Sequence, residues 1–97
     1  MEGARILVTG AGGPGAVNLS RSLLAMAPSP WVLAVDASPD YVFLALGHER
    51  ALVPRASDKE AYIGALNALI RRHNITFVMP NNSLEIAVLS AERERLL

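Results

Sequence analysis

The sequence predicts a Rossmann-like α/β fold, a three-layer α/β/α arrangement around a four-stranded parallel sheet of order 3-2-1-4. Short β-branched apolar runs alternate with stretches of helical periodicity, which is typical of parallel sheets with helices on both faces. A glycine-rich turn directly follows the first apolar run and precedes a helical stretch. Right-handed crossovers between four such β-α units give the stated strand order.

The first unit contains the most informative segment of the chain. A strand over residues 5–8 runs into a turn whose glycines fit G-x-G-x-x-G (Gly10, Gly12, Gly15) and also G-x-x-G-x-x-A (Gly10, Gly13, Ala16). Pro14 suits the first position of the following helix, because its missing N–H would have no partner there. The apolar positions continue to Ala27, and the prolines that follow end this helix.

The second unit begins with a strand over residues 31–35 that ends at Asp36. Ser38 is expected to cap a short helix that Gly47 stops. A third strand is expected near residues 51–53, and Ser57 with Glu60 has the spacing of a capping box at the start of the next helix.

The fourth strand is expected over residues 75–79. Asn82 or Ser83 can cap a last helix, which is expected to run to the end of the chain. Because residues 92–97 still have a helical pattern without a terminating glycine or proline, we expect the chain to be the N-terminal part of a longer protein, with a natural small protein as the alternative.

Length and composition limit the function. The 97 residues fit one domain, residues 1–97. Nine basic residues balance nine acidic residues, so a nucleic-acid partner is not expected. Cysteine is absent, and neither a membrane-spanning stretch nor a signal peptide is visible, so we expect a cytoplasmic protein without a membrane partner.

The glycine turn predicts a site for an anionic group. A loop without Cβ atoms allows a close approach, and the free N–H groups of the first helical turn point at the ligand. Asp36 lies 26 residues after Gly10, where an acid accepts hydrogen bonds from the ribose of NAD. A solvated turn acid, or a cap beside Ser38, explains Asp36 equally well.

A polar group follows the fourth expected strand. Asn81, Asn82, Ser83 and Glu85 are close to the expected position of the glycine turn and could orient a small polar substrate. Asn82 and Glu85 also have the spacing of a helix cap and its partner, which is the alternative interpretation. No catalytic residue and no metal ligand is predicted, because neither His48 nor His73 has a second ligand at metal-binding spacing.

Taken together, the glycine turn, the segments 35–39 and 53–55, and the Pro-x-x-x-Leu-Glu pattern at residues 80–85 resemble one family. They are similar to the N-terminal domain that precedes the ATP clamp in ATP-grasp ligases, above all in relatives of the carbamoyl-phosphate synthase large chain. The resemblance implies that ATP and Mg²⁺ bind mainly to downstream subdomains, which form an acyl phosphate that an amine or ammonia attacks. It also implies that the glycines and the polar residues 81–83 and 85 line a substrate wall facing a small anionic substrate. The chain alone is expected to be inactive.

Two other functions remain open at this point. One is an NAD(P)-binding domain of an epimerase-like or dehydratase-like oxidoreductase, which the glycine turn and Asp36 favour. The missing Tyr-x-x-x-Lys pair argues against it, since Ala45 and Leu66 follow the two tyrosines. The other is a non-catalytic module that forms a homodimer through the open edge of the fourth strand.

Overall fold

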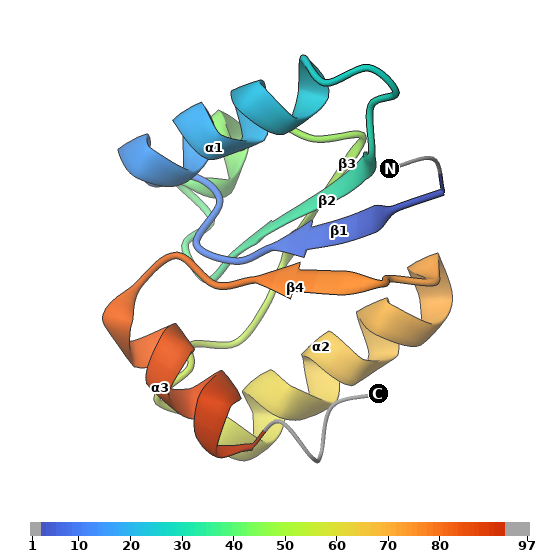
Figure 1. The fold of residues 1–97 in the computed structure, drawn as a ribbon. Helices are drawn as coiled ribbons and strands as arrows, with labels where there is room; N and C mark the ends of the chain where they lie inside the picture. Colours follow the sequence, from blue (N-terminus) through green and yellow to red (C-terminus); the bar gives the residue numbers. More distant parts are fainter. Residues whose placement is uncertain (1–2, 93–97) are drawn as a thin grey trace.

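Four parallel strands form a single sheet in the order β3-β2-β1-β4 (Figure 1). The computed structural model describes residues 3–92. Its strands are β1 (Arg5–Val8), β2 (Trp31–Asp36), β3 (Glu49–Leu52) and β4 (Phe77–Met79). The predicted fold class and strand order are therefore confirmed.

Helices cover both faces of the sheet. α1 (Pro14–Leu24) lies on one face, while α2 (Lys59–His73) and α3 (Ser83–Ala91) lie on the other (Figure 1). A short 3-10 helix, η1 (Val42–Leu44), joins β2 to β3. Among residues 3–92, no helix has both the length and the apolar character needed to cross a membrane.

Two hydrophobic cores lie on opposite faces of the sheet, because successive side chains of a strand point to opposite faces. In β1, Leu7 packs toward α2 and α3, whereas Ile6 and Val8 pack toward α1. The same alternation in β2 places Leu33 and Val35 in the core between the sheet and helices α2 and α3. These central strands are buried on both faces, which explains why their sequences read as continuous apolar runs.

Several predicted element boundaries are wrong. β4 begins at Phe77 and not at residue 75, because the Ile75 N–H bonds the Ile70 carbonyl and so completes the end of α2. β3 lies earlier than predicted, since the His48 N–H already bonds the Val32 carbonyl of β2.

The helix predicted after Ser38 is only the single turn η1, because Ala45 is already extended. α1 ends at Leu24, before the predicted Ala27. The N-cap of α2 is Asp58 and not the predicted Ser57, because the first backbone bond of the helix runs from the Tyr62 N–H to the Asp58 carbonyl. The predicted helix over residues 93–97 lies outside the described residues.

An aromatic cluster holds the amino end of the sheet together. The guanidinium of Arg5 lies 4.1 Å from the ring centre of Trp31, and the rings of His48 and His73 stack on Trp31. His48 Nδ1 also accepts a hydrogen bond from the Val32 N–H. Both histidines thus have structural contacts at the end of the sheet remote from the glycine turn.

Candidate functional site

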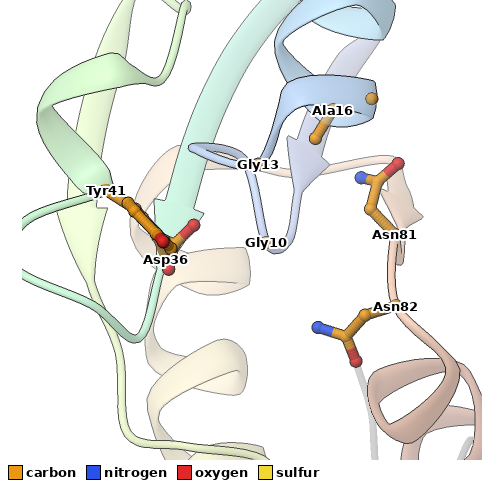
Figure 2. Close-up of a pocket in the computed structure, with 8 residues that line it drawn as sticks. Gly10, Gly13, Ala16, Asp36, Tyr41, Asn81 and Asn82 are labelled. Atoms are coloured by element: carbon orange, nitrogen blue, oxygen red, sulfur yellow. The ribbon is translucent and has the colours of Figure 1, made fainter.

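A cavity of about 520 Å³ lies at the carboxyl ends of the central strands (Figure 2). Three turns meet there: the glycine turn after β1, the turn after β2, and the turn between β4 and α3. This is where an open parallel sheet places its ligands. The lining residues are Gly10, Gly13, Gly15, Ala16, Asp36, Tyr41, Asn81 and Asn82.

Asp36 connects two of these turns. Its Oδ2 accepts a hydrogen bond of 2.9 Å from the Gly12 N–H, and its Oδ1 accepts one of 3.0 Å from the Ser38 N–H. The side chain is only 8% exposed, so its negative charge is held among backbone donors. Both carboxylate oxygens therefore fix the shape of the site.

Three backbone N–H groups of the glycine turn form hydrogen bonds within the chain. The Ala11 N–H bonds the Val35 carbonyl, the Gly12 N–H bonds Asp36, and the Gly13 N–H bonds the Gly10 carbonyl. These three amides of the glycine turn are therefore not available to a ligand.

The first turn of α1 presents the remaining amides. The first backbone bond of α1 runs from the Val17 N–H to the Gly13 carbonyl, so Gly15 and Ala16 have no earlier helical carbonyl to bond. Gly13 provides no capping side chain, and the first turn contains no acidic residue. Within the glycine turn and the start of α1, the backbone N–H groups available to an anion are those of Gly15 and Ala16.

Two glycines of the turn are required by close contacts within the chain. A Cβ on Gly12 would lie 2.0 Å from the carbonyl oxygen of Tyr41, so Gly12 packs against the segment after β2 and does not line the cavity. Gly10 has a φ of +56°, and a Cβ there would lie 3.0 Å from Glu85 Oε1. The left-handed conformation and this contact both favour glycine at position 10.

The asparagines on the opposite wall hold the last turn in place. Figure 2 shows Asn81 and Asn82 on the segment that leads to α3, across the cavity from Asp36. Asn81 Nδ2 donates to the Thr9 carbonyl at 2.8 Å. Asn82 Oδ1 accepts from the Glu85 N–H at 2.8 Å, and Asn82 Nδ2 donates to Glu85 Oε1. The capping role of Asn82 is confirmed, and Ser83 is an exposed residue at the start of α3.

Glu85 lies deeper and faces a second, smaller cavity of about 200 Å³. Its Oε2 accepts a hydrogen bond of 2.5 Å from the Tyr62 hydroxyl, which joins α3 to α2. Burial of the ring is the largest cause of a raised pKa of Tyr62, and the hydrogen bond to the Glu85 carboxylate raises this pKa further. This environment stabilises the neutral, protonated form of Tyr62. Gly10, Asp36 and Asn82 line both cavities.

The structure brings most of the predicted site residues together, but most of them have structural partners. Gly10, Gly13, Gly15, Asp36, Asn81 and Asn82 line the larger cavity, Glu85 lines the smaller one, and Gly12 and Ser83 line neither. The prediction missed Tyr41 and Tyr62. Tyr62 falls on the buried face of α2 like an ordinary core residue, and no motif marks Tyr41.

Within residues 3–92, no three histidine or acidic side chains gather closely enough to hold a metal ion. Comparisons of the chain with protein-family models and with curated proteins find no match.

Proposed function

We propose that this chain is a substrate-binding domain that holds a small anionic group at the N-terminus of α1. In the wider proposal it forms the N-terminal substrate wall of an ATP-dependent ligase of the ATP-grasp type, similar to the carbamoyl-phosphate synthase large chain. Such a ligase activates a carboxylate or bicarbonate as an acyl phosphate, which an amine or ammonia then attacks. The observation that carries the proposal is the pair of unbonded amides, Gly15 and Ala16, facing a cavity of about 520 Å³.

The N-terminus of α1 favours an anion at this position. The N-terminus of a helix carries a partial positive charge, and its free N–H groups are hydrogen-bond donors. No acidic residue in the first turn of α1 competes with a ligand. Asp36 lies across the cavity, but backbone N–H groups already bond both of its oxygens. A phosphate or carboxylate group matches these donors.

Two observations disfavour the alternative ligand, NAD(P). In a dinucleotide-binding turn the second glycine leaves space for the pyrophosphate, but here the Tyr41 carbonyl fills the space beside Gly12. The acid at the end of the second strand should bond the ribose, but Asp36 bonds Gly12 and Ser38. A small anion fits this geometry better than a dinucleotide.

ATP and Mg²⁺ bind mostly outside this chain in the proposed ligase, on a downstream ATP-grasp domain. The only lysine, Lys59, begins α2 and forms an ion pair of 3.0 Å with Glu92. It does not line the cavity. The domain would therefore contribute substrate contacts, while the phosphate-transfer chemistry would depend on the partner domain.

The decisive experiment places a negative charge beside the unbonded amides. Gly15 is exposed, and a Cβ there meets no atom within 4 Å, so Gly15→Glu should fold. We expect amide shifts of Gly15 and Ala16 when the wild-type chain is titrated with inorganic phosphate and followed by nitrogen–proton NMR. Gly15→Glu should weaken phosphate binding at least about tenfold, because its carboxylate competes for the same donors.

Gly15→Gln and Gly64→Glu are the matched controls. Gly15→Gln adds a side chain of the same size without charge and should weaken binding less than Gly15→Glu. Gly64→Glu adds the same charge on the exposed face of α2, where a Cβ also meets no atom, and should leave binding unchanged. Phosphate shifts confined to other residues would contradict the proposal, and so would saturable micromolar binding of NADH to the wild-type chain.

A further inference from the structure

A short apolar turn next to the cavity is unusually exposed. Tyr41 is 56% exposed, Phe43 75% and Leu44 58%, all within or beside η1. Single exposed apolar residues are ordinary on protein surfaces, whereas large contiguous apolar patches are typical of binding surfaces. Tyr41, Phe43 and Leu44 therefore make this turn a candidate binding surface.

The turn forms one wall of an apolar groove. The groove has a volume of about 490 Å³ and is lined by Gly12, Val17, Asn18, Tyr41 and Leu44, so that α1 forms its other wall. Tyr41 also lines the cavity at the N-terminus of α1. The groove and the cavity are therefore neighbours on one surface, with polar donors in the cavity and apolar side chains in the groove.

The wall of the groove is fixed to the glycine turn. The backbone of Tyr41 packs directly on Gly12, and the Tyr41 N–H bonds Ser38 Oγ at 3.4 Å. The Val42 N–H bonds the Ser38 carbonyl at 3.0 Å. Because Asp36 holds both Gly12 and Ser38, the same carboxylate sets the position of the groove relative to the free amides.

We propose that the substrate of this domain carries a ring-sized apolar body attached to its anionic group, and that this body lies in the groove between α1 and the Tyr41–Leu44 turn. The inference rests on the proposed function, since it extends the anion site along the surface. A small ligand with one charged and one apolar end matches both surfaces at once. Bicarbonate or a short hydrophilic acid would leave the groove without a function.

Three phosphate probes of increasing apolar size test this inference: inorganic phosphate, methyl phosphate and phenyl phosphate. We expect phenyl phosphate to bind at least about tenfold more tightly than methyl phosphate, because the ring removes apolar surface from water. Leu44→Ser should reduce this preference to about twofold without changing the affinity for inorganic phosphate, because Leu44 lines the groove and not the cavity.

Leu52→Ser is the matched control. Leu52 is 55% exposed on β3, close to the exposure of Leu44, and it lines neither the groove nor the cavity. It should retain the full preference for phenyl phosphate. A nitrogen–proton NMR spectrum of each variant verifies that it is folded before its affinities are compared.

The outcomes separate the two proposals. Equal binding of methyl and phenyl phosphate would overturn the inference and leave the anion site standing. A failure of all three phosphates to bind would overturn the proposed function and the inference with it. If Leu44→Ser instead converted a dimer to a monomer, with the preference for phenyl phosphate unchanged, the groove would be a contact between copies and the inference would be wrong.

Discussion

Asp36→Ala should cost this domain a large part of its stability. The Asp36 carboxylate accepts two backbone hydrogen bonds, from Gly12 and Ser38, and is only 8% exposed. A hydrogen bond to a charged group contributes about 1.5–3 kcal/mol. Gly12 is buried, so its N–H would lose its partner without access to water. We therefore expect a loss of about 3 kcal/mol of unfolding free energy, out of roughly 5–15 kcal/mol for a typical domain.

Urea unfolding followed by the fluorescence of Trp31, the only tryptophan, measures this loss directly. At about 4–8 °C per kcal/mol for a domain of this size, the melting temperature should also fall by more than about 10 °C. Asp36→Asn keeps one acceptor oxygen and should lose an intermediate amount. Asp40→Ala, the same change on the exposed turn, should stay within about 0.5 kcal/mol of wild type. If Asp36→Ala also stayed within that range, the assigned role of the carboxylate in joining the two turns would be refuted.

Two further predictions concern packing and charge. Gly12→Ala should destabilise the domain by at least about 2 kcal/mol, because its Cβ would lie 2.0 Å from the Tyr41 carbonyl oxygen; Gly64→Ala, which meets no atom, should gain about 0.5–1 kcal/mol from helix propensity. Equal stabilities of these two variants in urea would contradict the packing at Gly12. Because the folded state raises the pKa of Tyr62, the unfolded chain loses this proton first as the pH rises above about 10, so stability should fall by up to about 1.4 kcal/mol per pH unit there. Tyr62→Phe should lack this part of the alkaline slope, and an unchanged slope would show that the hydroxyl already ionises in the folded protein.

The sequence predicted the fold well because its central strands are strongly patterned. β1 and β2 are apolar on both faces, the glycine turn follows β1 directly, and Pro14 begins α1 as expected. These are local signals that agree with the tertiary structure. The edge strands were less well placed, because the start of β3 depends on pairing with β2, and Ile75 serves the end of α2. Such pairings are not local properties of the sequence.

The sequence predicted which residues lie near the cavity more accurately than it predicted the hydrogen bonds that they form. The three turns do meet at one cavity, as the strand order required. The roles depended on distant partners: Asp36 bonds a glycine turn 24 residues earlier, and Glu85 bonds Tyr62 from another helix. Spacing along the chain indicates that an acid lies near a turn, but it does not show which hydrogen bonds that acid makes.

The hydrogen bonds of Asp36 affect how a ligand would bind, as well as how the domain folds. They hold the glycine turn and the segment after β2 in one arrangement before any ligand arrives. A preorganised site avoids most of the entropic cost of ordering a loop on association. An anion that binds here should consequently leave the backbone dynamics of residues 10–16 almost unchanged, in contrast to a loop that closes over its ligand.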